Sequence, residues 1–351
     1  MNIHEKYIKR CIELAKNGLG ETYPNPMVGS VIILNDEIIG EGWHKKAGEH
    51  HAEVIAINSV KDKSLLKNAT IYVSLEPCSH FGKTPPCANL IVKNGIKKVV
   101  VGVIDSNSKV CGKGIKHLKN NDCNVIVGVL AKECLELNKR FFKFHNKKRP
   151  FILLKWAETK DGFIDKLRAE NDEKSPNWIS NVYSQQLVHK IRAVEQAILV
   201  GTTTAINDNP TLNVRNWVGN NPVRIVLDRR LKIPINYNLF DKNEITIVLT
   251  EKLSAETFNK NLIFEEIDFS KNIPKQVCKV LYNHKIQSVI IEGGAQTLQS
   301  FIDENLWDEA TVFVGKTTFG NGLLAPQMNK LPIKIEKISD DTLINYRNNE
   351  A

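Results

Sequence analysis

The sequence lacks any long hydrophobic run. None of its apolar stretches approaches the roughly 20 residues that a helix needs to cross a membrane. Its charged, amphipathic start also lacks the apolar segment of a secretory signal. We therefore expect a cytoplasmic protein with no membrane partner.

A disulfide framework is missing as well. The seven cysteines are an odd number and are widely scattered, whereas disulfide-rich folds carry an even number at regular spacings. Two of them, Cys78 and Cys87, belong to a motif described below. The other five are expected to pack as small hydrophobic side chains: Cys11, Cys111, Cys123, Cys134 and Cys278.

No internal repeat, low-complexity segment or long basic block is present. The formal net charge of +9 comes from dispersed residues, apart from the short run Lys147-Lys148-Arg149, which we interpret as a solvated connector. A basic protein can bind nucleic acid, or it can be an enzyme whose small substrate and cofactor carry phosphates. Charge alone does not separate these two classes.

The composition that remains is typical of a soluble globular protein, with 42% hydrophobic and 25% charged residues. The length suits two domains of ordinary size. In both halves, strand-like apolar runs alternate with helix-like segments, which predicts an α/β fold. Pro150 and the polar residues before it indicate a linker. We therefore place one domain in residues 1–146 and the other in residues 150–351.

In the first half, two predicted strands end where polar residues begin. The run ATIYVSL leads into Glu76-Pro77-Cys78, and KKVVVGV leads to Asp105. Ligands bind beyond the carboxyl ends of strands in open α/β sheets, so this edge is expected to carry the chemistry. A helix is expected to begin near His51, and KECLELNKRFFKFH is expected to form one closing helix.

The most informative motif lies at that edge: His51-Ala52-Glu53, then Pro77-Cys78, then Cys87. One imidazole and two thiolates can hold a zinc ion and leave its fourth position to water, whose pKa the metal lowers. Glu53 would then move protons between the attacking water, a ring nitrogen and the departing amine. Base deaminases share H-x-E but continue with P-C-x-x-C, whereas eight residues separate the two cysteines here.

A structural zinc site is the alternative interpretation of this motif. Such sites are closed by four protein ligands, and His44, His50 or His80 could supply the fourth. A structural site has no use for the carboxylate of Glu53, so the H-x-E spacing favours a catalytic metal.

In the second half, the run VGTTTAINDNPTLNVR places Thr204, Asp208 and Arg215 in a predicted loop after a strand. The chain lacks the G-x-G-x-x-G fingerprint of Rossmann dinucleotide sites. Gly293-Gly294 follows the strand SVIIE; this pair either lets backbone approach a phosphate or serves tight strand-to-helix packing. Lys155 lies in an otherwise apolar strand, where it either occupies an exposed face or reaches into a pocket.

Together these motifs resemble the bifunctional riboflavin-biosynthesis enzymes, in which a deaminase is fused to a reductase. The resemblance covers nearly the whole chain, and its most specific motif is LEPCSHFGKTPPC (75–87). The other matching motifs are PNPMVG (24–29), GEGWH (40–44), HAEV (51–54), WIS (178–180), HKIRA (189–193), ILVGTTTAINDNPTLNVR (198–215) and EGG (292–294).

The resemblance implies a cytidine-deaminase-like fold for the first domain and a dihydrofolate-reductase-like fold for the second. The first would use Zn²⁺ to hydrolyse an amine from 2,5-diamino-6-(5-phosphoribosylamino)pyrimidin-4-one. The second would use NADPH to reduce the ribosyl side chain to ribityl, with the hydride going to the sugar carbon bonded to the amine. The implied partners are a phosphorylated pyrimidine and NADPH, without nucleic acid; a homo-oligomer is compatible with this function.

The resemblance also implies a role for each matching residue. In the first domain, the zinc ligands would be His51, Cys78 and Cys87, with Glu53 as the catalytic proton carrier. The pyrimidine or ribose-phosphate pocket would be lined by Asn25, His44, Asp105 and Asn107. In the second domain, the substrate side would consist of Lys155, Ser180, Arg192, Leu212, Arg215 and Glu292. The cofactor side would consist of Ala157, Trp178, Thr204, Asp208, Gly293 and Gly294.

For four of these residues a purely structural role is the alternative. Asn25 and Asn107 are also common turn residues. His44 could be a core histidine with satisfied hydrogen bonds, and Trp178 could simply pack in the core.

The sequence departs from the family's pattern in places. Asp105-Ser106-Asn107-Ser108 stands where D-P-N-P is common, and Pro176 stands where a small polar residue is expected. Because the region around Pro176 differs in length as well, the contacts made by residues 158–177 are left open.

Two other functions fit part of the sequence. A zinc deaminase acting on tRNA or free nucleotides, with a non-functional second domain, would account for the zinc motif and the basic charge. It would not account for the cysteine spacing or for the reductase motifs. A metal-stabilised binding module would account for the ligands but not for Glu53.

Overall fold

The computed structural model describes residues 2–349, except for 80–84, 107–110, 170–173 and 253–259. The chain divides into two compact units, residues 1–148 and 149–351, here called unit 1 and unit 2. Every helix in the described part of the chain is too short or too polar to cross a membrane.

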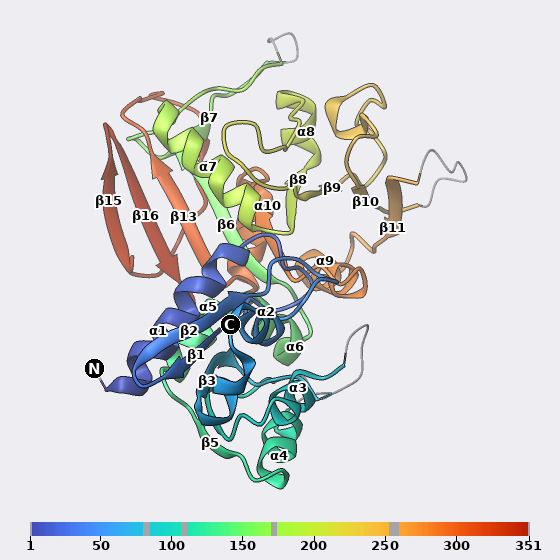
Figure 1. The fold of residues 1–351 in the computed structure, drawn as a ribbon. Helices are drawn as coiled ribbons and strands as arrows, with labels where there is room; N and C mark the ends of the chain where they lie inside the picture. Colours follow the sequence, from blue (N-terminus) through green and yellow to red (C-terminus); the bar gives the residue numbers. More distant parts are fainter. Residues whose placement is uncertain (1, 80–84, 107–110, 170–173, 253–259, 350–351) are drawn as a thin grey trace. The chain divides into compact units, whose positions relative to one another are not determined.

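Unit 1 is built on a five-stranded sheet with strand order β2-β1-β3-β4-β5 (Figure 1). β1 pairs antiparallel with β2 and β3, whereas β3, β4 and β5 run parallel. The strands are β1 (Gly29–Leu34), β2 (Glu37–Trp43), β3 (Thr70–Leu75), β4 (Lys98–Val103) and β5 (Asn124–Val127). The helices are α1 (Ile3–Ala15), α2 (Ala52–Ser59), α3 (Cys87–Lys93), α4 (Lys113–Asn120), α5 (Ala131–Leu137) and α6 (Lys139–Lys147), with 3-10 turns η1 (Lys16–Gly18) and η2 (Lys63–Asn68).

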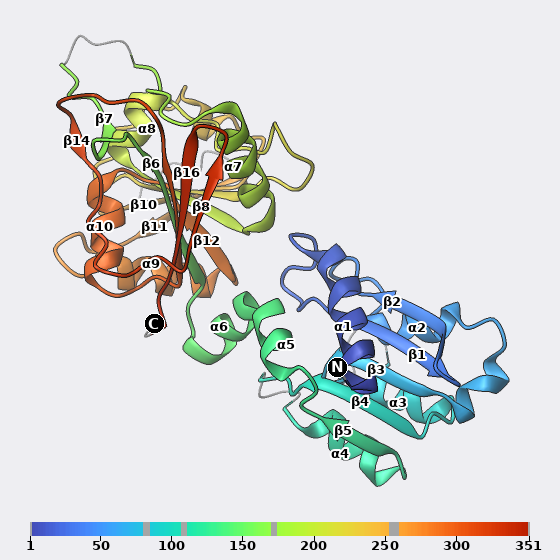
Figure 2. The ribbon, with the colours of Figure 1, turned by 90° about the vertical axis from the view of Figure 1, so that its left-hand side faces the viewer.

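Helices cover both faces of this sheet (Figure 2). On β3, Ile71 and Val73 pack with α2, α3 and α4, while the intervening Tyr72 packs with α1 and α5. Alternate side chains of a strand point to opposite faces, so a strand buried on both faces reads as a continuous apolar run. This explains why VSL and VVVGV carry no polar alternation.

The predicted closing helix of unit 1 is in fact two helices, because α5 ends at Leu137 and α6 begins at Lys139. The buried side chain of Asn138 lies at the break. It accepts a hydrogen bond from the backbone N–H of Met27 and donates one to the Met27 carbonyl, both at 2.8 Å. The break therefore anchors the PNPMVG segment, and the prediction of one helix was wrong.

Unit 2 contains a nine-stranded sheet with strand order β11-β10-β9-β8-β12-β6-β13-β16-β15. The strands from β11 to β13 run parallel, and β16 and β15 extend the sheet antiparallel. These strands are β6 (Phe151–Glu158), β8 (Ala197–Gly201), β9 (Val223–Leu227), β10 (Thr246–Thr250), β11 (Leu262–Glu266), β12 (Ser288–Ile291), β13 (Glu309–Val314), β15 (Lys334–Ile338) and β16 (Asp341–Arg347). A separate pair is formed by β7 (Phe163–Asp165) and β14 (Leu323–Leu324).

The helices of unit 2 again lie on the two faces of its sheet (Figure 2). One face packs against α9 and α10, and the other packs against α7, α8 and η3. These elements are α7 (Val182–Val194), α8 (Thr202–Asp208), η3 (Asn238–Phe240), α9 (Ile273–Asn283) and α10 (Ala295–Asp303). The predicted loop that carries Thr204 and Asp208 is therefore a short helix, α8, which ends at Asn209 in a left-handed conformation (φ 38°).

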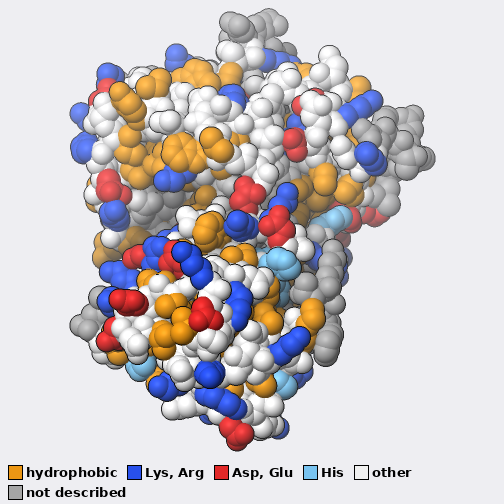
Figure 3. Space-filling view, in the orientation of Figure 1, with side chains coloured by type: hydrophobic (Ala, Val, Ile, Leu, Met, Phe, Trp, Pro, Cys, Tyr) orange, Lys and Arg blue, Asp and Glu red, His pale blue; other side chains and the backbone are white. Residues whose placement is uncertain are grey.

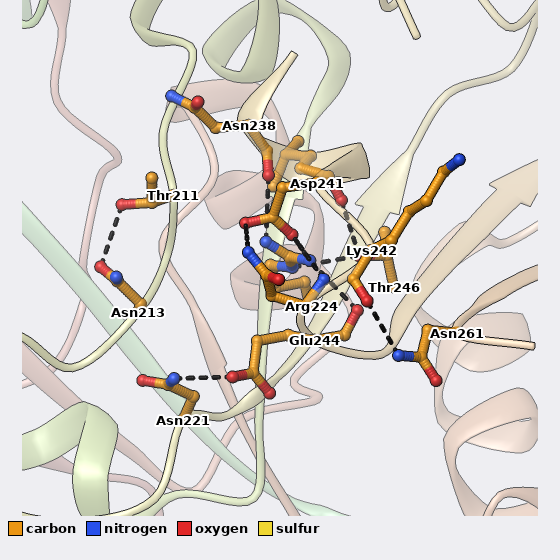
Figure 4. A network of polar contacts seen from close by, with 12 residues as sticks. Thr211, Asn213, Asn221, Arg224, Asn238, Asp241, Lys242, Glu244, Thr246 and Asn261 are labelled. Carbon is orange, nitrogen blue, oxygen red and sulfur yellow. Dashed lines mark hydrogen bonds and ion pairs between the residues drawn. The ribbon is translucent and has the colours of Figure 1, made fainter. Parts of the chain in front are cut away.

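A buried arginine ties β9 and β10 to the turn between them (Figure 4). Arg224 is 1% exposed, and its guanidinium donates to Thr246, to the carboxylate of Asp241, and to the carbonyls of Asn238 and Glu244. Each of the three guanidinium nitrogens thus has an acceptor, and the carboxylate of Asp241 balances the buried charge. Because Arg224 lies near the start of β9, the opposite, carboxyl edge of the sheet remains available for ligands.

Two side chains differ in exposure from the prediction. Arg149, expected in a solvated connector, is buried and forms a two-pronged ion pair with Asp308 at 2.7 and 3.0 Å. The same carboxylate accepts the backbone N–H of Ile152 at 2.8 Å, so it fixes the start of β6. Cys111 is exposed, whereas the other four cysteines expected to be buried are buried.

Candidate active sites

Three element ends bring the predicted zinc ligands of unit 1 together. His51 is the residue just before α2, in an extended conformation (φ −71°, ψ 162°). Cys78 follows the end of β3, and Cys87 is the first residue of α3. All three therefore lie beyond the carboxyl end of a parallel strand or at the start of a helix, at the edge where the sequence placed the chemistry.

The three donor atoms fit a zinc ion. His51 Nδ1 lies 3.5 Å from Cys78 Sγ and 3.3 Å from Cys87 Sγ, and all donor atoms lie within 4.8 Å of one another. Tetrahedral zinc, with bonds of about 2.0 Å to nitrogen and 2.3 Å to sulfur, separates such atoms by about 3.5 Å. Within the described part of the chain the cluster offers three ligands, the number that a catalytic zinc site takes from the protein.

One of the two thiols in this cluster, Cys78, is prepared for a metal, whereas the hydrogen bond with Cys78 and burial raise the pKa of Cys87 well above its usual range. The Cys78 sulfur accepts the backbone N–H of Cys87 at 3.3 Å. Hydrogen bonding from Cys87 and His51 outweighs burial and lowers the pKa of Cys78 to about 4. A thiolate is the form that binds metal, so less proton release is needed when zinc binds.

Glu53 lies one residue inside α2 and is buried, with 3% of its surface exposed. Residues two apart on a helix point to different sides, but His51 precedes the helix, so both side chains can serve one site. Burial raises the pKa of Glu53 to about 7. The carboxyl group is thus held in the low-polarity surroundings typical of a proton-transferring residue.

Asn25 and His44 form a relay next to the cluster. His44 Nδ1 donates to the carbonyl of His50 at 3.0 Å, since a carbonyl can only accept. Its Nε2 then accepts from the Asn25 amide at 3.0 Å. The imidazole lies edge-on to that of His51, with ring centroids 5.4 Å apart. Burial lowers the pKa of His44. Both ring nitrogens are engaged in hydrogen bonds, so the ring does not offer a fourth zinc ligand in this arrangement.

Asp105 lies just beyond β4, at the same sheet edge as Cys78, and is buried. Its backbone N–H donates to Glu76 at 3.2 Å. The predicted partner Asn107, like His80, lies outside the described residues. Glu76, which sequence reasoning passed over although it lies inside the LEPC motif, connects this segment to the zinc cluster.

In unit 2, three predicted substrate residues form a largely buried charge cluster, with side-chain exposures of 14% for Lys155, 12% for Arg192 and 8% for Glu292. The Arg192 guanidinium donates to both oxygens of Glu292, at 3.1 and 2.7 Å, and Lys155 Nζ lies 3.6 Å from the same carboxylate. Although burial acts in the opposite direction, the two cations lower the pKa of Glu292 to about 2. Burial lowers the pKa of Lys155. Lys155 thus reaches into the protein, not onto an exposed face.

The other predicted substrate residues differ in their surroundings. Arg215 is exposed, and its guanidinium donates to Thr211 and Asn213. Its backbone N–H points to Nδ1 of buried His189, at 3.4 Å. Leu212 packs in the core with a left-handed φ of 54°, and Ser180 accepts at its carbonyl from Gln185. His189, quoted within HKIRA but given no role from the sequence, therefore lies between α7 and the Arg215 segment.

Two predicted cofactor residues meet at the carboxyl edge of the sheet. The Gly294 N–H donates to the hydroxyl of Thr204 at 2.9 Å. A Cβ on Gly293 would lie 2.7 Å from the backbone nitrogen of Gly201, so packing against β8 requires a glycine there. Ala157 lies on β6, packed near α7 and β13. Trp178 is 62% exposed, which rules out the alternative of core packing.

Asp208 is held by a residue that the sequence did not single out. Arg168, in the segment whose contacts were left open, donates to Asp208 at 3.2 Å and to Asp165 at 2.9 Å. Burial outweighs this contact and raises the pKa of Asp208 to about 6. The segment after β7 is thus tied to the end of α8.

A basic cavity adjoins the same helix. It has a volume of about 390 Å³ and lies at the carboxyl ends of β8 and β9. Arg229 pairs with Glu251, and the charge of Arg230 also acts on this carboxylate. The sequence signal was present, since RRLK directly follows the strand VRIVLD. The lining residues are Thr202, Thr203, Ile206, Asp228, Arg229, Arg230 and Lys232.

Two family models match the two units. Residues 1–103 match the cytidine and deoxycytidylate deaminase zinc-binding region, and residues 150–343 match the RibD C-terminal domain. The riboflavin biosynthesis protein RibD of Aquifex aeolicus is 38% identical over 358 residues, covering 98% of both chains. The chain belongs to the RibD family. The RibD protein of a Synechocystis species is 36% identical over 92% of this chain and 86% of its own.

Solved structures agree with this assignment along the whole chain. The diaminohydroxyphosphoribosylaminopyrimidine deaminase/5-amino-6-(5-phosphoribosylamino)uracil reductase of Thermotoga maritima superposes with a TM-score of 0.88 at 36% identity, covering 98% of both chains. The RibD structure of Acinetobacter baumannii gives a TM-score of 0.88 at 33% identity, with the same coverage.

The family assignment settles the class of function. The chain is a bifunctional deaminase and reductase of riboflavin biosynthesis, with a cytidine-deaminase-like unit and a RibD reductase unit of the dihydrofolate-reductase type. Its cofactors are zinc and NADPH. A deaminase acting on tRNA with a non-functional second domain is not favoured, because the match extends through both units.

Proposed function

We propose that unit 1 converts 2,5-diamino-6-(5-phosphoribosylamino)pyrimidin-4-one into the aminouracil, and that unit 2 reduces the ribosyl side chain of this product with NADPH. The observation that carries the first step is the cluster of His51, Cys78 and Cys87 with the buried carboxyl of Glu53 beside it. The same three ligand types with an H-x-E glutamate occur in zinc deaminases of nucleobases.

In the deamination, water replaces an amine on the pyrimidine ring. Zinc, when bound, supplies a water of lowered pKa. The Glu53 carboxylate takes a proton from the attacking water and delivers it to the ring nitrogen. A second transfer through Glu53 protonates the amine, which leaves as ammonia while the ring carbon becomes a carbonyl. Asn25, His44 and Asp105 orient the pyrimidine at the carboxyl edge of the sheet.

For the reduction, the basic cavity beside α8 supports the use of a phosphorylated cofactor. Arg230 and Lys232 lie close to Thr202 and Thr203, which can donate hydrogen bonds to phosphate oxygens. Thr204 follows β8 and Gly294 follows β12. In the sheet these strands stand between β9, beside the cavity, and β6, which carries Lys155 of the charge cluster. We assign the cavity to a phosphate group of NADPH.

NADPH, when bound, supplies a hydride to the sugar carbon bonded to the amine, in the ring-opened form of the substrate. The step also needs a proton on the substrate nitrogen. Lys155 is the buried cation suited to hold that proton at Nζ, because Glu292 keeps it in place. Arg215, the more exposed of the two arginines, is free to turn toward the substrate phosphate, whereas Arg192 is held by Glu292.

The domain limits, the site residues and the partners of the chain follow from the same proposal. Residues 1–146 carry the deaminase and residues 150–351 the reductase. A cytoplasmic location and the absence of nucleic acid as a partner stay predictions. A homo-oligomer is supported by exposed apolar side chains over α7 and the neighbouring strands of unit 2 (Figure 3), among them Val182, Tyr183 and Ile335.

The test is mass spectrometry of the products formed by the full chain from the diaminopyrimidine ribosyl phosphate, with and without NADPH. We expect the deaminated product without NADPH and the deaminated, reduced product with it. Glu53→Gln should abolish deamination, retain zinc, and still reduce the deaminated compound when this is supplied. No reaction from zinc-loaded protein would overturn the proposal, and deamination without reduction would overturn its second half.

A further inference from the structure

Glu76 is a buried carboxylate with an unusual set of partners. It is 4% exposed and follows β3 directly, two residues before Cys78. Its oxygens accept four backbone N–H groups: those of Asp105 (3.2 Å), Gly112 (2.9 Å), Gly114 (2.9 Å) and Ile115 (3.2 Å). Four backbone N–H dipoles thus stabilise the negative charge of this carboxylate.

These four bonds join three elements at one place. The Glu76 N–H itself donates to the carbonyl of Val103, which continues the register Leu75–Val103 of β3 and β4. One carboxylate oxygen accepts from Asp105 and Gly112, and the other accepts from the first turn of α4. Glu76 therefore joins Asp105, just after β4, to the first turn of α4.

The first turn of α4 depends on this carboxylate. Gly112 is the residue before the helix, has φ 72°, and offers no side chain to cap it. Glu76 supplies the missing acceptor from outside, where a negative charge is also favoured by the helix dipole. A Cβ on Gly114 would lie 2.0 Å from the carbonyl oxygen of Pro77, so the helix start is pressed against the segment that carries Cys78.

We propose that Glu76 is a positioning residue of the deaminase: it holds Asp105 and the start of α4 in fixed relation to Cys78, so that the substrate is bound in register with the metal. This rests on the proposed function of unit 1. Glu76 touches neither the substrate nor a zinc ligand in this role, because its oxygens are already used by backbone N–H groups. Its contribution should thus appear in substrate binding rather than in metal content.

The test uses Glu76→Gln in the full-length, zinc-loaded protein. Glutamine keeps the shape but replaces one acceptor oxygen by an NH₂ group, which faces two backbone N–H groups and cannot accept from them. We expect the KM of deamination to rise about 10-fold to 100-fold, because two buried backbone N–H groups lose their acceptor. Zinc per chain and reduction of the deaminated compound by unit 2 should stay unchanged.

A control variant and a double variant complete the test. Asp62→Asn makes the same carboxylate-to-amide change at a cap of η2, near the start of β3, where Asp62 accepts from the Ser64 N–H at 2.9 Å; it should leave the deamination constants unchanged. Asp105→Asn should raise the KM by itself. The KM of the double variant with Glu76→Gln should rise no further than about the larger single effect, because both residues act on the same contact.

Several outcomes would overturn the proposal while leaving the proposed function intact. The first is an unchanged KM in Glu76→Gln, and the second is a loss of zinc together with activity. The third is a fall in stability while the KM and kcat of the zinc-loaded fraction stay unchanged. The fourth is a KM of the double variant that equals the product of the two single fold-changes of Glu76→Gln and Asp105→Asn. Absence of deamination in the unaltered protein would instead contradict the function assigned to unit 1.

Discussion

The Arg192 guanidinium and the Glu292 carboxylate form a two-pronged ion pair inside unit 2, at 3.1 and 2.7 Å. Arg192 comes from the end of α7, and Glu292 directly follows β12. Lys155 shares the same carboxylate from β6, 3.6 Å away. A single anion therefore balances two buried cations that three elements bring to the carboxyl edge of the sheet.

This relationship predicts a large loss of stability for Glu292→Gln. The change would leave Arg192 and Lys155 buried without a compensating charge, and removing one partner of a buried pair costs about 3–5 kcal/mol. Denaturant unfolding followed by tryptophan fluorescence suits the measurement, because four of the five tryptophans lie in unit 2. The matched control is Glu309→Gln, whose partner Arg347 is 39% exposed; it should cost about 1 kcal/mol or less. Equal losses in both variants would contradict the prediction.

Removal of zinc should separate the two activities. A chelator is expected to abolish deamination and to leave reduction of the deaminated compound unchanged, and added zinc should restore the first activity. Cys78→Ser should lower zinc per chain, since serine does not offer the thiolate donor. Cys111→Ser is the control, because this cysteine is exposed and lies outside the ligand cluster. Loss of reduction together with zinc would contradict an independent second site.

The basic cavity makes a prediction about cofactor choice. Arg230→Ala removes a cation from the lining of the cavity. A charge-assisted hydrogen bond contributes about 1.5–3 kcal/mol, so the KM for NADPH should rise about tenfold or more. If the cavity binds the phosphate that distinguishes NADPH from NADH, the KM for NADH should change little. Arg347→Ala, on β16 in the half of the sheet away from β8 and β9, should alter neither constant. An equal rise for both cofactors would place a phosphate common to both in the cavity.

The zinc cluster shows what could be predicted from the sequence. The ligand types and their spacing identified His51, Cys78 and Cys87, because zinc chemistry restricts donors to a few residue types. The strand ends before Cys78 and Asp105 were also predicted, since apolar runs buried on both faces are unambiguous. Here the local sequence carries enough information, and the fold only has to bring the ends together.

The sequence predictions of helices and exposure were wrong where residues far apart in the chain decide the local structure. KECLELNKRFFKFH has an uninterrupted helical pattern, yet it breaks at Asn138 because this side chain binds the backbone of Met27. The segment TTTAIND forms α8 although its β-branched threonines are weak helix formers. Arg149 looked solvated because its partner Asp308 lies far along the chain.

The site misses have a similar origin. Glu76 and His189 stand inside recognised motifs, but their roles depend on backbone groups of other segments: the start of α4 for Glu76 and the Arg215 segment for His189. A side chain that serves the backbone leaves no periodic or spacing signal in the sequence. The basic cavity, by contrast, was detectable from RRLK after a strand, since strand ends carry ligands in such sheets.

The last prediction concerns acid sensitivity of unit 2 and rests on His189. This side chain is 4% exposed. Its Nδ1 accepts the Arg215 N–H, so the ring is neutral with its proton on Nε2. Burial, followed by the charges of Arg192 and Arg215, lowers the pKa of His189 to about 4, compared with 6.5 for an unperturbed histidine.

The direction in which the free energy of unfolding changes with pH follows from this lowered pKa. Above pH 6.5 both the folded and the unfolded protein hold a neutral His189, and its contribution to stability is fully present. As the pH falls from 6.5 toward 4, the unfolded chain takes up a proton that the folded chain does not, so the free energy of unfolding decreases. Between pH 8 and pH 5 this loss amounts to about 2 kcal/mol.

His189→Asn removes this titration and places an amide oxygen where Nδ1 stands, so that it can accept the Arg215 N–H. The decrease in the free energy of unfolding between pH 8 and pH 5 should therefore be about 2 kcal/mol smaller in the variant than in the unaltered chain. Urea unfolding at the two pH values, followed by tryptophan fluorescence, measures both differences. Other titrating groups contribute equally to the two proteins and cancel in the comparison. An equal decrease in both proteins would show that His189 takes up its proton in the folded protein as readily as in the unfolded chain. The pKa of His189 would then not be lowered by burial or by the charges of Arg192 and Arg215.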